Sequence, residues 1–192
     1  MSEFEPALQF VLKHEGTQLF EDKATGERSR YGITQKVLVA LKYPVQDPAL
    51  LDHQDLRKIY EGQYWTGLDQ ISSQLVANKI FDMRVNMGTK QAITLTQAAI
   101  NSVGGACVID GLLGPHTIIV INQFLLTTNG EERLLSELVL KCCTFYKQIA
   151  TGDRAKFLTG WLTRAEDIGT GEIDKAAFST LRSGDNDKTV KG

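Results

Sequence analysis

The stretch VLKHEGTQLFEDKATGERSRYGITQ (residues 11–35) joins a helix end, a loop rich in carboxylates and a tyrosine–glycine step into another helix. Gly16 is a typical helix stop, and apolar residues precede it at helical spacing: Phe4, Leu8, Val11 and Leu12. Glu15 continues this apolar stripe by one turn. We therefore expect a partly buried glutamate at the end of the first helix.

A glutamate in this position can act as a general acid. Burial disfavours the charged form of a carboxylate, so a half-buried carboxyl group keeps a proton more readily and can donate it. Gly16 allows a ligand to approach the backbone closely. The loop beyond it could supply a second carboxylate from Glu21, Asp22 or Glu27, or a hydroxyl that holds a water. From spacing alone, a solvated helix end followed by a soluble acidic loop is the alternative.

The composition is that of a globular protein. The chain has 192 residues, of which 42% are hydrophobic, and a formal net charge of -2. This balance gives no broad attraction to nucleic acid, and no segment predicts membrane insertion. The N-terminus lacks the pattern of a signal peptide, so we expect synthesis in the cytoplasm without one.

The sequence predicts no metal site and no cofactor. His14 and Glu15 begin a His-Glu pair, but Gln18 stands where a zinc-binding helix needs its second histidine. Three cysteines, Cys107, Cys142 and Cys143, lie on helical or core-like stretches without a second ligand cluster. We expect them to be buried thiols in a reducing compartment.

Helical periodicity runs through most of the chain. After the first helix, the expected helices span residues 34–43, 55–65, 74–87, 90–101, 117–126, 131–149 and 156–168. The fold class is mainly α, with room for a small β-hairpin only at residues 19–30. The polar residues that follow Gly169 are expected to fray.

Five segments in order resemble glycoside hydrolase family 108 and its associated peptidoglycan-binding region. They are HEGTQLFEDKATGERSRYGIT (14–34), IYEGQYW (59–65), FDMRVNMG (81–88), IDGLLGPHT (109–117) and FYKQIATGDRAKFLTGWLTRAEDI (145–168). The resemblance covers residues 8–168. It implies a lysozyme-like helical fold and an N-acetylmuramidase that cuts peptidoglycan between N-acetylmuramic acid and N-acetylglucosamine.

The resemblance also implies roles for particular residues. Glu15 matches the catalytic glutamate, and the implied substrate-binding residues are Tyr31, Gly32, Tyr64, Trp65, Asp82 and Asn86. Aromatic rings can stack on pyranoses, and asparagine can exchange hydrogen bonds with acetamido groups. The alternative is structural: Trp65 could be plain core, Asp82 could pair internally, and Trp161 is expected in the core.

The sequence departs from the family pattern in the loop. Thr17 replaces a glycine, Ala24 replaces the expected aspartate, and Ser29 replaces a threonine. We predict that Glu27, ranked above Asp22, supplies the missing carboxylate and that Ser29 positions a water. The alternative is a catalytically weak or inactive peptidoglycan-binding or structural module that retains the fold.

The predicted organisation is a lysozyme-like catalytic lobe (1–101), a helical peptidoglycan-binding region (102–168) and a polar tail (169–192). Within the second region, residues 109–117 either help bind glycan or only turn the chain into the next helix. We expect a monomeric phage or prophage endolysin, or a secretion-associated muramidase. It would act in the periplasm or cell wall after passage through a holin or a dedicated secretion channel.

Overall fold

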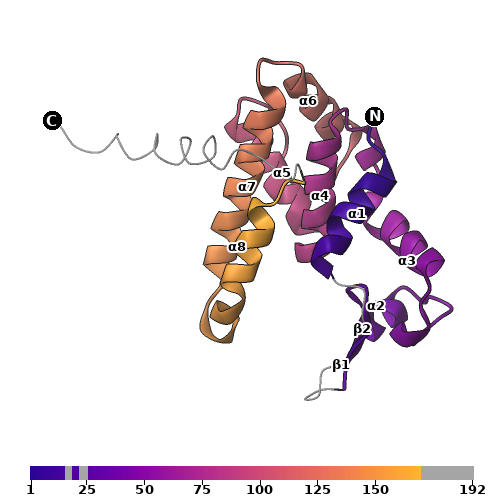
Figure 1. The fold of residues 1–192 in the computed structure, drawn as a ribbon. Helices are drawn as coiled ribbons and strands as arrows, with labels where there is room; N and C mark the ends of the chain where they lie inside the picture. The colour runs from indigo at the N-terminus through magenta and orange to yellow at the C-terminus, as the bar shows by residue number, and fades with distance from the viewer. Residues whose placement is uncertain (16–18, 22–25, 170–192) are drawn as a thin grey trace.

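A computed structural model describes residues 1–15, 19–21 and 26–169. The N-terminal part contains α1 (Phe4–Glu15), a small sheet of β1 (Phe20–Glu21), β2 (Arg28–Arg30) and β3 (Ile33–Thr34), and α2 (Gln35–Ala40). Next come the short helix η1 (Pro48–Leu50), α3 (His53–Tyr60), the π-helical turn η2 (Glu61–Trp65) and η3 (Leu68–Gln70). The predicted mainly α, lysozyme-like fold is confirmed (Figure 1).

The remaining chain is helical. It forms α4 (Gln74–Met87), α5 (Thr89–Ser102), α6 (Pro115–Leu125), α7 (Gly130–Ile149), the short helix η4 (Gly152–Phe157) and α8 (Leu158–Glu166). The predicted bounds of the helix at residues 74–87 agree with α4, because Ser73 caps its start and Gly88 leaves the helix at positive φ. Thr34 caps α2 as expected, accepting a hydrogen bond from the Val37 N–H.

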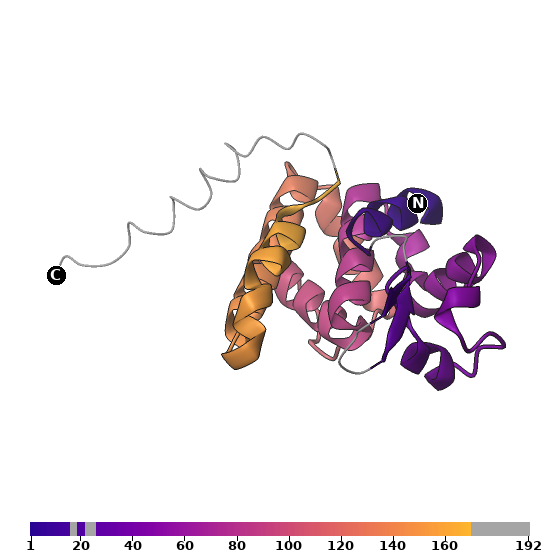
Figure 2. The same ribbon diagram turned by 60° about the horizontal axis from the view of Figure 1, so that its bottom comes forward.

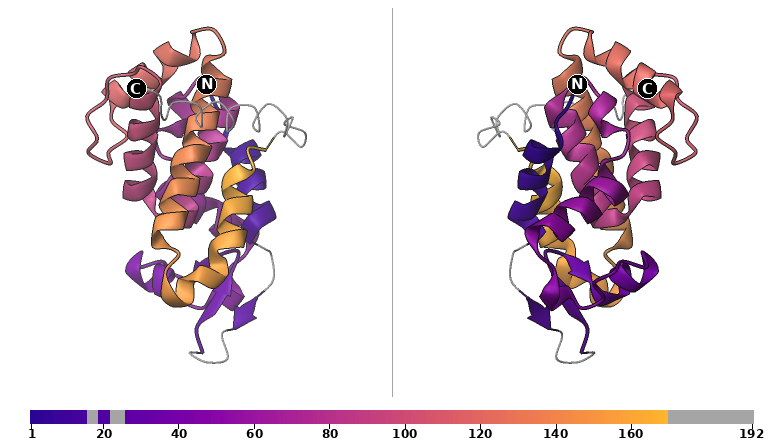
Figure 3. Two further views of the ribbon diagram at one scale, coloured as in Figure 1. Left: turned by 90° about the vertical axis from the view of Figure 1, so that its left-hand side faces the viewer. Right: turned by 90° about the vertical axis from the view of Figure 1, so that its right-hand side faces the viewer.

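The central helix of the fold is α4, which packs against α1, α5 and α7. Every residue from 76 to 84 on α4 is buried, including the polar Asn78, Lys79, Asp82 and Arg84. A helix that is buried all round is surrounded by other elements. In Figure 2, α4 and α5 lie between α7 and α8 on one side and the sheet with α2 and α3 on the other. The views from the two sides in Figure 3 show α8 alongside α7, with the sheet near the end of the molecule where α7 turns into α8.

The sheet is larger than the sequence predicted. It is an antiparallel meander with β2 in the middle, and β3 lies beyond the window of residues 19–30. Strands of two or three residues are too short to show an alternating pattern in the sequence. Tyr31 and Gly32 connect β2 to β3 with φ of 56° and 72°, which is the two-residue hairpin turn that matches strand twist.

Candidate active site

Glu15 is the last residue of α1 and lies at the junction of three helices. The buried stripe of Phe4, Ala7, Leu8 and Val11 docks α1 on the core and brings Glu15 inward at its end. Its side chain is 17% exposed, and Oε1 is 2.7 Å from Nη1 of Arg164 on α8. The expected partial burial of Glu15 is therefore observed.

The hairpin turn between β2 and β3 packs on the other side of this carboxylate. A Cβ placed on Gly32 would collide with Oε2 of Glu15, so no other residue fits here without displacing that side chain. Tyr31 is buried, and its carbonyl accepts a hydrogen bond of 2.8 Å from the Tyr60 hydroxyl. Tyr31 and Gly32 thus contribute backbone atoms to the site and no polar side-chain group.

A buried network of charges lies behind Glu15. Arg164 donates from Nε to Oδ1 of Asp82 at 2.8 Å, and Nζ of Lys79 lies 3.9 Å from Oδ2 of Asp82. Lys79 also donates to the carbonyls of Arg164 (3.2 Å) and Asp167 (2.9 Å). Burial lowers the pKa of Arg164, but the charges of Asp82 and Glu15 outweigh burial and raise it overall. The guanidinium therefore stays charged and links Glu15 to α4 and α8.

Asp82 is positioned by this network. Only 2% of the residue is exposed, and it faces Arg164 and Lys79. This arrangement favours the internal ion pair, which the sequence left open as an alternative to substrate binding. Sequence reasoning assigned no role to Arg164, although it falls inside the quoted segment at residues 145–168. Only folding brings α8 against the end of α1.

Tyr60 on α3 and Tyr64 on η2 lie within electrostatic range of Glu15. Burial raises the pKa of Tyr60, and the charge of Glu15 adds to this effect. The pKa of the half-buried Tyr64 is raised for the same two reasons. Both hydroxyls therefore stay protonated: Tyr60 donates to the Tyr31 carbonyl, and Tyr64 can donate a hydrogen bond near Glu15. Of the two, Tyr64 was predicted to bind substrate.

The other two predicted substrate-binding residues, Trp65 and Asn86, contact other parts of the fold. Trp65 is 6% exposed and packs against Phe4 and Phe81, which favours its alternative role in the core. Asn86 is partly buried near the end of α4 and donates from Nδ2 to the Tyr146 hydroxyl at 2.6 Å. Asn86 is therefore connected to α7.

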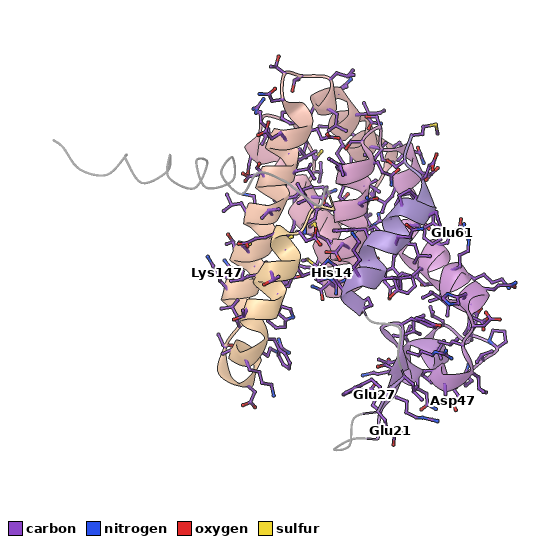
Figure 4. The ribbon with its side chains drawn as sticks, in the orientation of Figure 1. His14, Glu21, Glu27, Asp47, Glu61 and Lys147 are labelled. Carbon is purple, nitrogen blue, oxygen red and sulfur yellow. The ribbon has the colours of Figure 1, made fainter. Side chains whose placement is uncertain are left out.

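The predicted loop residues lie on or next to the sheet. Ser29 is on β2, is partly buried, and is paired with Phe20 on one side and Thr34 on the other. Glu27 precedes β2 and is exposed, and Figure 4 shows it beside Glu21 towards the outer end of the sheet. Residues 16–18 and 22–25, which include Gly16, Thr17, Asp22 and Ala24, lie outside the described residues.

The segment at residues 109–117 has a structural role in the described chain. Oδ1 of Asp110 accepts hydrogen bonds from Nε2 of Gln97 (2.7 Å) and the N–H of Leu112 (2.9 Å), and the Gln97 bond is the main cause of the lowered pKa of Asp110. The N–H of Gly111 donates to Oε1 of Gln97 at 2.9 Å, and Pro115 is the first residue of α6. These contacts favour a turn that starts a helix.

Among the residues that the structure describes, no three His, Cys, Asp or Glu side chains gather as a metal site. In the same part of the chain, no helix has the length and apolar character needed to cross a membrane.

The fold is lysozyme-like, and comparisons with known proteins show the class of enzyme. Residues 8–88 match the Glycosyl hydrolase 108 family model and residues 91–166 match the Predicted Peptidoglycan domain model. Residues 8–88 thus form a glycosyl hydrolase family 108 domain that precedes a predicted peptidoglycan domain, and the chain is a glycoside hydrolase of a peptidoglycan hydrolase family.

A solved structure has the same fold. The chain is similar to SagA of Brucella abortus, with 21% identity over 90% of this chain and 93% of that one, and a TM-score of 0.69. At this identity the likeness shows the fold alone. No curated protein matches the chain.

Proposed function

We propose that Glu15 is the general acid that cleaves the glycosidic bond between N-acetylmuramic acid and N-acetylglucosamine in peptidoglycan. The observation that carries this proposal is the placement of Glu15: a half-buried carboxyl group at a helix end, held by Arg164 and covered by the backbone of Gly32. In glycoside hydrolysis, a carboxylic acid protonates the leaving oxygen as the bond breaks.

Arg164 supports this chemistry in two ways. Its bond to Oε1 fixes the orientation of the Glu15 side chain, because the guanidinium is itself held by Asp82. It also provides a positive charge next to the carboxylate that remains after Glu15 has given its proton to the leaving sugar. Arg164 thus orients Glu15 and faces its carboxylate after proton transfer.

The opposite side of the substrate requires a group that positions a water or stabilises the positive charge of the sugar. Ser29 lies on the strand that leads into the Tyr31–Gly32 turn, and its hydroxyl is our candidate for holding a water. Glu27 is the candidate carboxylate. Its assignment remains a prediction, as does the contribution of Asp22.

The second candidate function is a wall-binding module with weak catalysis. One observation favours it: Ala24 occupies the position of the family's acid. The arrangement of Glu15, Arg164 and Gly32 favours activity, because a pure binding module has no need of a positioned half-buried carboxyl group.

Mass spectrometry of purified peptidoglycan after incubation with the protein distinguishes these functions. A muramidase releases fragments with reducing muramic acid ends. Free stem peptides would instead indicate an amidase or peptidase, and an unchanged wall that retains the protein would indicate a binding module.

The substrate determines where the protein would act. A peptidoglycan hydrolase works in the periplasm or cell wall, so we propose a phage or prophage endolysin that reaches the wall through a holin, with a secretion-associated muramidase as the alternative. Lysis of cells that co-express a holin, compared with cells that produce the chain alone, tests this role.

A further inference from the structure

The chain leaves α8 along the surface of α1. Asp167 directly follows α8, and its Oδ2 lies 3.0 Å from Nε2 of His14, the residue before Glu15. Two residues further on, a Cβ on Gly169 would lie 3.1 Å from the ring of Phe10. Phe10 and His14 are one turn apart on α1, and their rings meet edge to face. The chain therefore runs along one face of α1, starting beside the residue that precedes Glu15.

Both carboxylate oxygens of Asp167 have partners. Oδ2 accepts from His14, because a carboxylate only accepts hydrogen bonds and Nε2 must then carry the proton. Oδ1 accepts from the Gly169 N–H at 2.8 Å, which turns the chain directly after the helix. Ile168, between these two residues, is buried. Asp167 thus ties the end of α8 to α1.

A buried lysine of α4 holds the same helix end. Nζ of Lys79 donates to the carbonyl oxygens of Arg164 at 3.2 Å and Asp167 at 2.9 Å. The carbonyls at the C-terminal end of a helix carry partial negative charge, so an ammonium group stabilises that end. Lys79 is almost fully buried, and its charge needs these partners. We call His14, Lys79 and Asp167 the α8 clasp.

The clasp holds the helix turn that carries Arg164. Arg164 lies three residues before Asp167, whose N–H donates to the Arg164 carbonyl at 3.3 Å. The guanidinium of Arg164 bridges Asp82 and Glu15. Because this bridge reaches across from α8 to α1 and α4, the distance between the three helices determines where the guanidinium meets Glu15. The clasp joins the same three helices one turn further along α8.

We propose that the α8 clasp positions the general acid. His14 and Asp167 tie the end of α8 to the end of α1, and Lys79 ties the same end to α4. Arg164 then meets Glu15 at one distance and one angle. The clasp residues are positioning residues, because their effect on Glu15 passes through Arg164. This inference rests on the proposed function for the role of Glu15.

The position of Asp167 in the sequence makes this role new to the chain. The match to the Predicted Peptidoglycan domain ends at residue 166, so Asp167 lies outside both matched segments. Figure 4 shows its partner His14 on the side of α1 that faces α8. The residue that closes the clasp therefore follows the second domain, while the carboxyl group that it positions belongs to the first.

Asp167→Ala tests the clasp in the full chain. The side chains of the broken pair are partly exposed, 20% for His14 and 36% for Asp167, so the variant should fold. The first measurement is hydrogen exchange of the Arg164 Nε–H by NMR, because this group donates to Asp82 and exchanges when the guanidinium moves away. The second measurement is kcat and KM on soluble glycan strands.

Asp47→Ala is the matched control for the exchange measurement. Its side chain is 35% exposed, and its Oδ2 accepts from Arg28 at 2.8 Å. Oδ1 of Asp47 accepts from the N–H two residues further on, as Oδ1 of Asp167 does. The partner of Asp47 lies on β2 and not on α1, so Arg164 should exchange at the parent rate in this variant.

We expect Asp167→Ala to speed exchange of the Arg164 Nε–H about tenfold, the effect of losing one charged hydrogen bond. It should lower kcat about tenfold and leave KM unchanged, because a displaced general acid affects the reaction more than binding. His14→Ala should have the same effects. His14→Gln should restore most of the loss, because its amide N–H can still donate to Asp167.

Three results would overturn the clasp. They are a parent exchange rate in Asp167→Ala, faster exchange with a parent kcat, and a His14→Gln variant that behaves like His14→Ala. The second would show that the contact serves stability alone. A failure of the proposed function would look different, because the parent chain would then release no reducing muramic acid ends. The exchange rates would still show whether His14 and Asp167 hold Arg164.

Discussion

The charged side chains on the helical side of the candidate site are largely buried, whereas those on the sheet side are exposed to water. On the helical side, Glu15, Asp82, Lys79 and Arg164 come from α1, α4 and α8 and form a largely buried network. On the sheet side, Arg28 lies 4.0 Å from Glu21 and 2.8 Å from Asp47, and these side chains are between 35% and 63% exposed. Water screens the charges on the sheet side and hardly reaches those on the helical side. Breaking an ion pair should therefore cost more stability on the helical side.

The largest effect is expected for Glu15→Gln. The amide keeps the shape of the side chain but cannot donate a carboxyl proton, so turnover should fall by about 100-fold or more. Release of reducing ends from purified peptidoglycan measures this loss. The control is Glu137→Gln on α7, because Glu137 is also ion-paired, with Lys141 at 3.0 Å, and its side chain is similarly buried at 19% exposure. A wild-type rate in Glu15→Gln would refute the assignment of the general acid.

Arg164→Ala should have the next largest effect, and it should appear in stability as well as in activity. Removing the guanidinium leaves Asp82 and Glu15 without their common partner, which costs about 3–5 kcal/mol in the free energy of unfolding for a buried pair. Urea denaturation followed by circular dichroism measures this cost. Arg28→Ala, which breaks the exposed pair with Asp47, should cost at most about 1 kcal/mol. Equal losses in the two variants would contradict the contrast between the two sides.

The sequence predicted local features of the fold better than contacts between distant segments. Thr34, Ser73 and Gly88 mark helix ends through their own backbone and side-chain preferences, so the start of α2 and both ends of α4 could be predicted from local residues alone. The partial burial of Glu15 followed from the stripe of its own helix. Arg164 and the third strand could not be found in this way. The first depends on the docking of α8 against α1, and the second on a turn in which the non-glycine residue Tyr31 takes a positive φ.

Gly32→Ala tests the contact between the sheet and Glu15. The added methyl group would displace the Glu15 carboxylate and also strain a backbone at φ of 72°. We expect turnover to fall about tenfold, since small displacements of a catalytic group are costly. Gly26→Ala separates the two causes, because Gly26 has a similar φ of 68° but open space around its Cβ position. If both variants lose activity equally, strain in the sheet is responsible and contact with Glu15 is not.

The smallest effect is expected for Glu27→Gln, which tests whether the sheet side contributes a carboxylate at all. Glu27 is exposed and precedes β2, so solvent weakens its influence on charge at the substrate. If it is the second carboxylate, its amide should lower kcat a few-fold while KM stays unchanged, because the group would act on the developing charge more than on binding. Glu21→Gln is the matched control, since Glu21 lies beside Glu27 near the outer end of the sheet (Figure 4). Steady-state rates on soluble glycan strands measure both variants. Unchanged kcat in both would mean that neither of these acids is needed, which leaves Asp22 and Ser29 as the candidates opposite Glu15.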